Sequence, residues 1–508
     1  MKEQRSKDGS SGVSLWPQIA SQWLPLTLIL LLATGLYFYQ LDRQSLWIDE
    51  LLSIDSAQDI DGSLGRFFNN RILYFLLLRG WMSFGESDAW LRSLGIIFAL
   101  GSIYLTYQLG SRLLSKACGL IGALLVALSP LFIHHAQEVR MYTTSTFLGL
   151  LGTLIVSYAL ENPKMQTVFG WAIARFLAIV TTPLNLFLLL PDIVLIGWKF
   201  RSQRLHWWRF ILGLILIGIL WLPWIVPLAI SSSKFMGGAS VAGATVGGTV
   251  DKSSPGLWAV LSQPLRFTVW PFGRANSALI YWIYILFVWV LAFLLGTALL
   301  QVRHARNLGW VAAWALLPAI PLFAVSQVSR SLWVNRYLLF TTPYLFLLFA
   351  AGWMYVWKRW HLGAIAIALL YAVTASGGIK RYYSVQDRAN WRGLVQAIAN
   401  EERPKDAIVW STGQVQPLAL EHYYKGSAAI KMAEIPLPCT ASSNRQAMQS
   451  WLKTLSKDYS RYWLICSLGD DNLPIFEINL SSQFEIENHQ IFHGEAGGNL
   501  HLFLVSWK

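Results

Sequence analysis

The sequence predicts an α-helical protein that crosses a membrane many times and ends in a small soluble α/β domain. Of its 508 residues, 55% are hydrophobic and only 13% are charged, which is about half the charged fraction usual in soluble proteins. The chain also contains 26 tryptophans, a residue that gathers where a bilayer meets water. These values exclude an ordinary soluble enzyme, a disordered chain and a fibrous repeat.

Long uncharged stretches define a transmembrane domain over residues 1–379. A spanning helix needs about 20 predominantly apolar residues, and stretches of this kind recur throughout this part of the chain. Two spans are expected within Met165–Trp198, which is broken near Pro183, so the total is about eleven transmembrane helices. The other nine are Gly9–Leu41, Ser93–Ser111, Ala117–Gln137, Met141–Leu160, Phe210–Ser233, Ala275–Val302, Asn307–Ser329, Tyr337–Trp357 and Trp360–Ile379.

The short apolar stretch Ile72–Gly85 determines the predicted orientation. It contains Arg79 and is too short to cross the bilayer, so we expect an interfacial helix in the first external loop. The basic loops, such as 199–209, then lie in the cytoplasm, as basic loops between spans usually do. The sequence therefore predicts a multi-pass protein of the plasma (inner) membrane with a cytoplasmic N-terminus. Its net charge of +13, which in a soluble protein would suggest nucleic acid, is assigned to these loops and to contacts with membrane lipids; no nucleic acid is expected as a partner.

Residues 380–508 form the second predicted domain, a small extracytoplasmic α/β domain. Segments with helical spacing alternate there with segments of strand character. Cys439 and Cys466 both fall in this domain, where an oxidising compartment would permit a disulfide, although spacing alone does not bring them together. The expected helices are Asn390–Ala399, Gln416–Tyr424 and Gln446–Lys457, and the expected strands are Asp406–Ser411, Tyr462–Ser467, Phe484–Glu487 and Leu500–Val505.

Arg175 and Asp192 are charged residues inside the apolar hairpin that turns near Pro183. Each lies about two helical turns from the bend, and so at a similar depth. A charge in a membrane is costly and often functional, but two opposite charges at one depth fit a structural ion pair better. We therefore expect Arg175 and Asp192 to pair across the fifth and sixth spans.

Acidic residues near the outer membrane boundary are candidate catalytic groups. Asp49 and Glu50 follow Trp47 a few residues after the first span, and Glu138 follows the third span. The ordinary alternative is the start of a solvated loop, or a local ion pair with Arg140. In the predicted topology, however, Asp49 and Glu138 face the same compartment. A carboxylate held in a partly dry cleft is suited to act as a general base.

His134 and His135 stand shortly before Glu138. They are adjacent rather than spaced as ligands on one helical face, so the spacing gives little support to a metal site. We predict no metal-ligand set and no certain cofactor. A divalent metal remains possible, since Asp49 and Glu138 could act with or without a cation.

Arginines at the outer membrane boundary are the second group of candidates. Arg336 opens the tenth span beside Tyr337, Arg71 precedes the interfacial helix, and Arg140 follows Glu138. Arginines at this depth have an ordinary role in pairing with lipid headgroups. They are also suited to bidentate recognition of phosphate, and a phosphate carried on a lipid would arrive at the same depth.

Five motifs follow one another along the chain: WIDE (Asp49, Glu50), RILYFLLLRGW with FGESDAWLRSLG, SPLFIHHAQEVRMY, NRYLLFTTPYLFLL and YYSVQDRANWRGL. In this order they resemble the motifs of bacterial members of glycosyltransferase family 39. This family belongs to the GT-C superfamily, with protein O-mannosyltransferases and lipid A aminoarabinose transferases as relatives. The resemblance covers most of the chain. One departure is Asn69-Asn70-Arg71-Ile72, where many members carry a His-Pro-Pro-like or acid-Lys-Pro-like sequence.

The resemblance implies a GT-C-type fold and an enzyme that takes a sugar from a polyprenyl-phosphate carrier. Such enzymes transfer the sugar, with inversion, to a lipid, glycan or protein acceptor outside the membrane. By resemblance, Asp49 is the catalytic base with Glu50 beside it, and Glu138 orients a substrate or holds a metal. The remaining residues implied are Arg71, Arg140, Arg336 and Tyr337 for the donor phosphate, and Tyr142 and His135 for the substrate site.

The competing interpretation is a polytopic transporter or flippase of a lipid-linked saccharide. Such a protein is expected to contain paired internal repeats, broken helices and acidic residues near the bilayer centre. The sequence shows no such repeat, and its candidate acids cluster at the outer boundary. A glycosyltransferase therefore explains the distribution of charge better.

Overall fold

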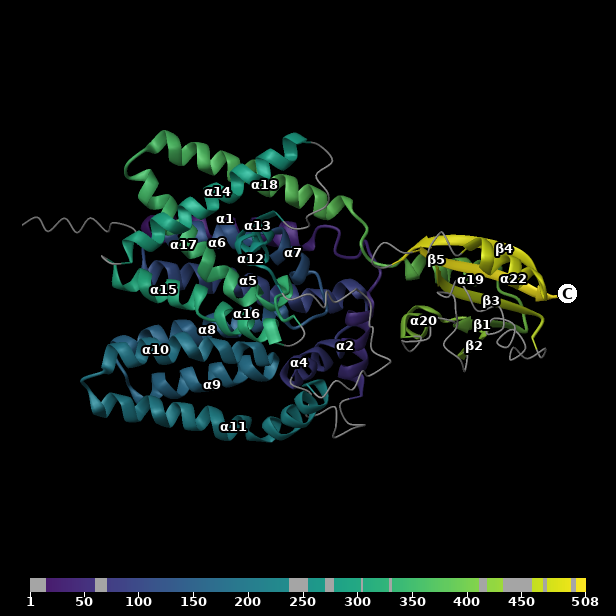
Figure 1. The fold of residues 1–508 in the computed structure, drawn as a ribbon, viewed down its shortest axis with the longest axis horizontal. Coiled ribbons are helices and arrows are strands. Elements are labelled where there is room, and N and C mark those ends of the chain that lie inside the picture. Colours follow the sequence, from purple (N-terminus) through teal and green to yellow (C-terminus); the bar gives the residue numbers. More distant parts are fainter. Residues whose placement is uncertain are drawn as a thin grey trace, which may run out of the picture.

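The computed structural model describes residues 15–59, 71–236, 255–269, 278–302, 305–328, 331–410, 418–432, 459–468, 473–494 and 499–508. It consists of a helical bundle with a small domain of strands and helices beyond one end (Figure 1). Asn69, Asn70, Cys439 and the expected helix Gln446–Lys457 lie outside the described residues. The disulfide between Cys439 and Cys466 therefore stays a prediction.

The bundle is built from the predicted membrane-spanning helices. These are α1 (Leu15–Phe38), α5 (Asp88–Leu113), α6 (Lys116–Ala127), α7 (Pro130–Ala136), α8 (Tyr142–Glu161), α9 (Met165–Thr181), η1 (Pro183–Leu188), α10 (Leu189–Phe200), α11 (Arg204–Met236), α14 (Ala278–Gln301), α15 (Arg306–Leu316), α16 (Ala319–Val328), η3 (Leu339–Thr341), α17 (Thr342–Trp357) and α18 (His361–Ser384). Among the described residues, eight segments are long and apolar enough to span, and the bent pair α6–α7 would be a ninth. The other two predicted spans coincide with α1 and α9, whose apolar parts are shorter. The protein is thus a polytopic helical membrane protein.

The bend between α6 and α7, at an angle of 64°, follows from the sequence Ser129-Pro130. A residue before proline disfavours the helical conformation, and Ser129 has φ −73° and ψ 114°. Its hydroxyl then caps α7 by accepting a hydrogen bond from the amide of Phe132 at 3.2 Å. The chain leaves α7 in a new direction, so the connection 137–141 is buried inside the protein.

Two short helices, α2 (Ile48–Gln58) and α4 (Ile72–Met82), pack together in the first loop (Figure 1). With 11 residues, α4 is about 16 Å long, too short to cross a bilayer, as the sequence predicts. Trp81 of α4 stacks on Trp90 of α5 with ring centroids 4.6 Å apart. Each indole N–H donates to the main-chain oxygen of the other residue, which fixes α4 to the start of α5.

Arg175 and Asp192 form the predicted ion pair in the interior of the bundle. Nε of Arg175 lies 2.7 Å from Oδ2 of Asp192, and Nη2 lies 3.0 Å from Oδ1. The indole N–H groups of Trp171 and Trp314 also donate to the carboxylate, at 2.7 and 2.8 Å. Both residues are fully buried. Because this pair is bidentate and its carboxylate has two further donors, its desolvation is well compensated.

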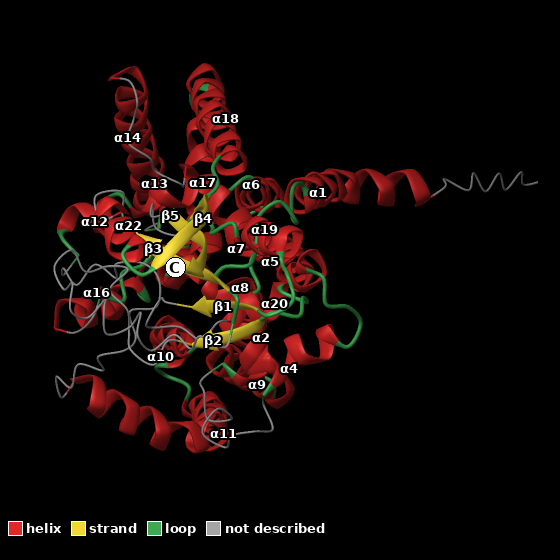
Figure 2. Ribbon diagram, turned by 90° about the vertical axis from the view of Figure 1, so that its right-hand side faces the viewer, coloured by secondary structure: helices red, strands yellow, loops and turns green. Residues whose placement is uncertain are grey.

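The C-terminal domain is an α/β unit around one mixed sheet of order β2-β1-β3-β5-β4. β1 is parallel to β2 and β3, while β5 is antiparallel to β3 and β4. Figure 2, which looks at the molecule from the side of the domain, shows these strands in front of the bundle. The helices and strands of the C-terminal domain are α19 (Trp391–Glu401), β1 (Asp406–Trp410), α20 (Leu418–Tyr423), β2 (Ala429–Met432), β3 (Arg461–Leu468), α22 (Leu473–Ser481), β4 (Phe484–His493) and β5 (Asn499–Trp507).

The sheet has an apolar layer on each face. Ile408 and Trp463 belong to the core that continues through α19 into the bundle, whereas Val409 and Leu464 pack with α22 in a separate cluster. β2 is the one strand among these that the sequence did not predict. The long helix α18 continues to Ser384, past the domain boundary predicted at residue 379.

Candidate active site

The predicted site residues gather at the end of the bundle that faces the C-terminal domain. Three segments meet there: the start of α2, the connection 137–141 between α7 and α8, and η2 (Asn335–Tyr337) just before η3. α2 begins where it does because the side chain of Glu50 accepts the amide N–H of Trp47 at 3.2 Å. This is the acidic half of a capping box, and it places Asp49 in the first helical turn.

Asp49 lies between two arginines from distant parts of the chain. Its Oδ2 atom is 3.5 Å from Nη2 of Arg140 and 3.6 Å from Nη1 of Arg336. Its side chain is 16% exposed, so the carboxylate is enclosed but still reachable from solvent. The structure thus brings together residues that the sequence predicted separately as a base and as phosphate ligands.

Arg140 also forms hydrogen bonds with α2. Its Nη1 atom donates to the main-chain oxygen of Asp49 at 2.8 Å and to the hydroxyl of Ser53 at 3.0 Å. Burial opposes the charged form of Arg140, but the neighbouring Tyr142 and Asp49 outweigh it and raise the pKa of the guanidinium. Arg140 is therefore a fixed cation.

Two more arginines complete a cluster of positive charge. The guanidinium carbon of Arg336 lies 5.4 Å from the ring centre of Tyr337. Arg71, which precedes α4, has its pKa lowered by burial and by the nearby charge of Arg140, against the opposing influence of Tyr142, Tyr337 and Asp49. Three guanidinium groups thus lie near one carboxylate, and the site attracts anions.

Unpaired donors point to the same conclusion. The Nε atoms of Arg140 and Arg336 are buried and have no hydrogen-bond partner among the described residues. Buried polar groups without a partner are uncommon in folded proteins. An anion with several oxygen acceptors would satisfy both donors.

Glu50, which the sequence predicted as catalytic beside Asp49, occupies a different environment. It is fully buried and accepts from Arg92 through Nε and Nη2, from Arg388 and from the amide of Val139, all at 3.0 Å, in addition to Trp47. A carboxylate has about four lone-pair sites, so these donors occupy it completely. Burial raises the pKa of Glu50, but Arg388 and Arg92 more than compensate and lower it. The Glu50 carboxylate therefore has no free acceptor site in this structure, and the catalytic role given to it from the sequence stays a prediction.

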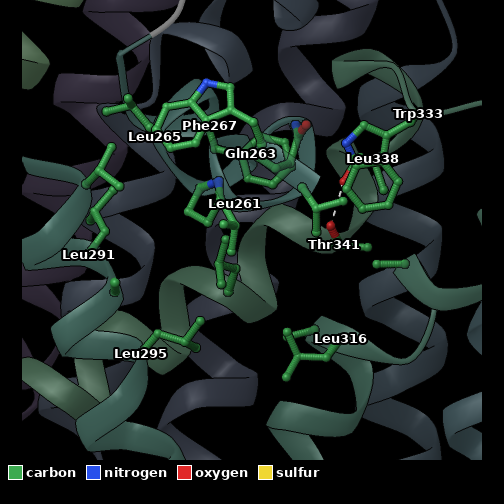
Figure 3. Close-up of a pocket in the computed structure, with 18 of the residues that line it drawn as sticks. Leu261, Gln263, Leu265, Phe267, Leu291, Leu295, Leu316, Trp333, Leu338 and Thr341 are labelled. Carbon is green, nitrogen blue, oxygen red and sulfur yellow. Dashed lines mark hydrogen bonds between the residues drawn. The ribbon is translucent and has the colours of Figure 1, made fainter. Parts of the chain in front are cut away.

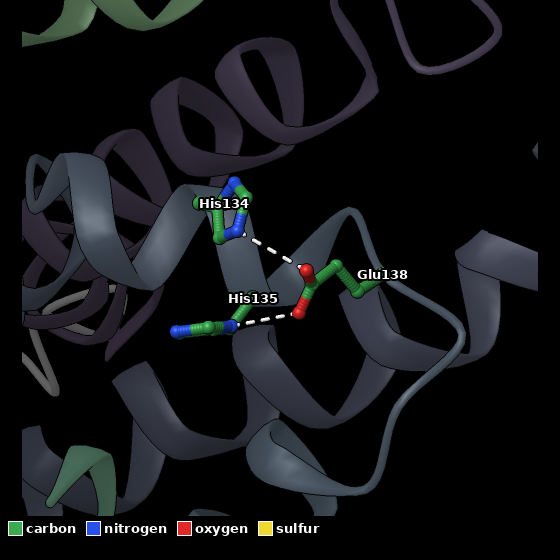
Figure 4. Close-up of side chains that lie close together, drawn as sticks. All are labelled: His134, His135 and Glu138. Carbon is green, nitrogen blue, oxygen red and sulfur yellow. Dashed lines mark hydrogen bonds and ion pairs between the residues drawn. The ribbon is translucent and has the colours of Figure 1, made fainter. Parts of the chain in front are cut away.

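Glu138 is held between two histidines, as Figure 4 shows. Its Oε1 atom is 3.1 Å from Nε2 of His134, and Oε2 is 2.7 Å from Nδ1 of His135. Burial raises the pKa of Glu138, but the two histidines outweigh it and hold the pKa well below its ordinary value. The turn after α7 brings Glu138 back toward both rings, a proximity that the adjacency of His134 and His135 in the sequence does not show.

One ligand atom from each of these three residues lies within 4.8 Å of the others, and histidine with carboxylate is a common zinc set. The same atoms, however, already pair with one another. Nη2 of Arg388 lies 3.9 Å from Oε1 of Glu138, and its positive charge opposes a divalent cation. The arrangement is explained by the direct pairs alone.

Arg92 and Arg388 are site residues that the sequence did not single out. Arg92 is buried within α5 and donates to three main-chain oxygens of the loop before α2, those of Leu41, Gln44 and Ser45. Arg388 lies in the segment that leads from α18 into the C-terminal domain. A charged residue directly before the apolar run of α5 was the available signal for Arg92, and the YYSVQDRANWRGL motif was the signal for Arg388.

An apolar pocket opens beside η2 (Figure 3). It has a volume of about 390 Å³ and is lined by α12 (Leu257–Leu261), α13 (Gln263–Val269), α14, α15, α16, η3 and α17, together with Trp333 and Leu338. Gln263, at its wall, donates to Oδ1 of Asn335 at 3.2 Å, one residue before Arg336. The pocket therefore lies close to the arginine cluster.

No protein-family model matches the chain, and no curated protein matches it in sequence. Its fold, however, is similar to that of solved membrane glycosyltransferases. ArnT from Cupriavidus metallidurans in the apo state superposes with a TM-score of 0.57 and 13% identity, over 95% of this chain and 98% of that one. ArnT bound to undecaprenyl phosphate gives 0.56 and 14%, with the same coverage.

The archaeal oligosaccharyltransferase AglB from Archaeoglobus fulgidus, in complex with an inhibitory peptide and a dolichol-phosphate, gives a TM-score of 0.50 at 11% identity. That match covers 96% of this chain and 74% of AglB. At sequence identities this low, the structural similarity is evidence for the fold alone. On this structural similarity, the chain has the fold of the GT-C glycosyltransferases.

Proposed function

We propose that the protein is a polyprenyl-phosphate-dependent glycosyltransferase, a bacterial member of family 39, that acts on the extracytoplasmic side of the plasma membrane. The observation that carries the proposal is the convergence of Asp49 with Arg140, Arg336 and Arg71 beside an apolar pocket. The N-terminus lies in the cytoplasm in this proposal and the α/β domain outside. Proteins of the same fold have been solved with undecaprenyl phosphate and with a dolichol-phosphate.

The arginines would bind the donor phosphate. Arg140 and Arg336 each keep a buried Nε–H without a partner, and a guanidinium binds phosphate oxygens through two parallel hydrogen bonds. As the bond to the sugar breaks, negative charge develops on the phosphate oxygen, and cations already in position stabilise it.

The pocket would receive the start of the polyprenyl chain. Its lining is almost entirely aliphatic and aromatic, and burial of apolar surface stabilises by about 25 cal/mol per Å². A lipid phosphate that enters from the bilayer could thus place its chain in the pocket and its phosphate against Arg336.

Asp49 would act as the general base. The acceptor hydroxyl attacks the anomeric carbon of the sugar from the face opposite the phosphate, and its proton passes to the carboxylate of Asp49. The new C–O bond forms as the bond between anomeric carbon and phosphate oxygen breaks, and the electron pair leaves on the phosphate. This single displacement inverts the anomeric configuration. The acceptor is a lipid, a glycan or a protein.

The test uses purified protein in lipid nanodiscs, undecaprenyl-phosphate-linked radiolabelled hexoses and pentoses, and envelope fractions from a strain that lacks this chain. The wild type is expected to transfer label to an envelope component, and D49N to transfer none. If the wild type transfers no label but, reconstituted in vesicles, moves the lipid-linked sugar between leaflets, the transporter interpretation replaces this one.

A further inference from the structure

The segment that presents Asp49 takes many of its hydrogen-bond partners from the C-terminal part of the chain. We refer to residues 42–50, which join α1 to the start of α2, as the catalytic segment. The partners come from the strap, defined as residues 382–392, and from α20 of the C-terminal domain. Residues from the two ends of the sequence therefore form one structural unit at the site.

The strap contacts the catalytic segment first through main-chain groups. The amides of Asp387 and Arg388 both donate to Oε1 of Gln44, at 3.3 and 3.1 Å. Nε2 of the same glutamine donates to the main-chain oxygen of Val385 at 3.3 Å. The amide of Arg392 donates to the hydroxyl of Ser45 at 3.1 Å. The strap is thus aligned along the catalytic segment.

A second set of contacts joins the domain to the same segment through side chains. The guanidinium of Arg392 donates to the main-chain oxygen of Asp42 at 2.7 Å and also pairs with Asp88 at the start of α5. The hydroxyl of Tyr423 in α20 accepts the amide N–H of Leu46 at 2.7 Å and donates to Asp88. These bonds hold the segment from the side of the domain.

Arg388 is the contact closest to the candidate base. Its Nη1 atom donates to Oε2 of Glu50, the residue next to Asp49, at 3.0 Å. Its Nη2 atom donates to the main-chain oxygen of Gln137 at 3.4 Å and lies 3.9 Å from Glu138. One buried guanidinium therefore joins the first turn of α2 to the connection 137–141, which carries Arg140.

We infer that the C-terminal domain positions the catalytic segment for sugar transfer and that Arg388 is the positioning residue through which it acts. The inference rests on the proposed function for its catalytic consequence. Arg388 does not touch Asp49. It sets the distance between Asp49 and Arg140 by fixing Glu50, next to Asp49, and Gln137, which begins the connection that carries Arg140. The domain is on this account a working part of the transferase site.

The test measures hydrogen–deuterium exchange of the purified full chain in nanodiscs, together with transfer kinetics. R388Q is compared with R388K, which keeps the charge, and with K380Q. Lys380 is an exposed cation near the end of α18, so K380Q loses the same charge from a nearby surface position. Peptides covering Ile48–Ser53 report the catalytic segment, and peptides of β3 and β5 report the stability of the domain.

R388Q is expected to accelerate exchange in Ile48–Ser53 at least tenfold, R388K to stay within threefold of the wild type, and K380Q to change nothing. In transfer assays R388Q should lower kcat at least tenfold and leave the donor KM within threefold, because the phosphate ligands remain. Wild-type exchange in Ile48–Ser53 of R388Q overturns the inference.

If R388Q also accelerates exchange in β3 and β5, the substitution has destabilised the domain as well. The double variant E50Q/R388Q then separates positioning from loss of stability, because it removes both charges of the buried pair. Fast exchange confined to Ile48–Ser53 then supports positioning, and wild-type exchange there overturns it. The exchange measurement needs no sugar donor. A wild type without transferase activity would therefore contradict the proposed function and leave the exchange result to decide the positioning role.

Discussion

Oδ2 of Asp49 lies 3.6 Å from Nη1 of Arg336, although one residue belongs to the first loop and the other to the segment before α17. The separation is longer than a direct hydrogen bond. Both groups therefore keep hydrogen-bonding capacity that a substrate can use. Substitutions of Asp49 and of Arg336 should therefore affect different properties. The first should affect proton transfer, and the second should affect phosphate binding.

Replacing Asp49 by asparagine should abolish transfer without loss of lipid phosphate binding. General bases contribute about 10²–10⁴-fold to the rate, so we expect kcat to fall by at least about a hundredfold. Affinity for undecaprenyl phosphate, measured by thermophoresis, should stay within threefold or rise, since a negative charge beside the arginines is removed. E86Q is the control, because Glu86 is an exposed acid in the turn before α5. D49N with more than a tenth of wild-type kcat would exclude Asp49 as the base.

Replacing Arg336 by glutamine should weaken the binding of undecaprenyl phosphate about tenfold, as expected for the loss of one charge-assisted contact. Its side chain is 29% exposed, so the fold should tolerate the change. R140Q should lower both the affinity and Tm, because Arg140 also holds Asp49 and Ser53. R359Q removes the same charge from the other end of α17 and serves as the control. Equal affinity in R336Q and R359Q would argue against a phosphate ligand at Arg336.

Leu261 lines the apolar pocket and is 56% exposed. Replacing it by the larger tryptophan should impair the use of long-chain donors more than that of short-chain donors. L261W is expected to raise the KM for an undecaprenyl-phosphate-linked sugar about tenfold, roughly the loss of 50 Å² of buried apolar surface. The KM for a ten-carbon analogue should change less. L362W, on exposed Leu362 of α18 outside the pocket, is the matched control. An equal rise for both donors would place the lipid elsewhere.

The buried pair of Arg175 and Asp192 should be strongly non-additive. Removing one partner leaves a buried charge uncompensated at a cost of about 3–5 kcal/mol, so R175M and D192L alone should each lower Tm markedly. The double variant R175M/D192L should be less destabilised than the sum, because no unpaired charge is left in the interior. Neutral groups alone lose a partner: the indole N–H groups of Trp171 and Trp314, the main-chain oxygen of Gly149 and the hydroxyl of Thr153. Thermal unfolding in one detergent compares the set. A drop in the double variant equal to the sum would show that the two side chains stabilise the bundle independently.

Acid should destabilise the site region through Glu50. Its pKa is lowered in the folded protein from an ordinary value of 4.5, so its contribution to stability is present above pH 4.5 and is lost as pH falls toward the folded value. Tm measured between pH 7 and pH 3 should decline in the wild type below about pH 4.5. The Tm of E50Q should be lower than that of the wild type at pH 7, and it should decline less between pH 7 and pH 3. Parallel curves for the two proteins would mean that Glu50 does not drive the acid response.

Which structural features can be predicted from the sequence depends on the interactions that create them. Arg175 and Asp192 could be paired from sequence because an apolar hairpin leaves two opposite charges no other partner at that depth. Asp49 could be placed beside Arg336 only through resemblance, since no local periodicity relates loops so far apart in the chain.

Other features depend on contacts that no sequence pattern records. Glu50 is completely buried, and the motif WIDE does not show which acid of the adjacent pair is buried. Glu138 meets both histidines because the chain turns directly after α7 and returns Glu138 toward rings three and four residues earlier. The pocket is formed by side chains from seven separate elements, and no single element shows it in its own sequence.

The bond between the amide of Leu46 and the hydroxyl of Tyr423 also bears on the order in which the protein is made. The catalytic segment is synthesised well before Arg388, Arg392 and Tyr423, which stand far later in the chain. Until those residues have been made, the segment lacks the partners that they supply. A chain that stops before Arg388 therefore carries Asp49, Arg140 and Arg336 but not the contacts from the C-terminal side that hold the segment in place.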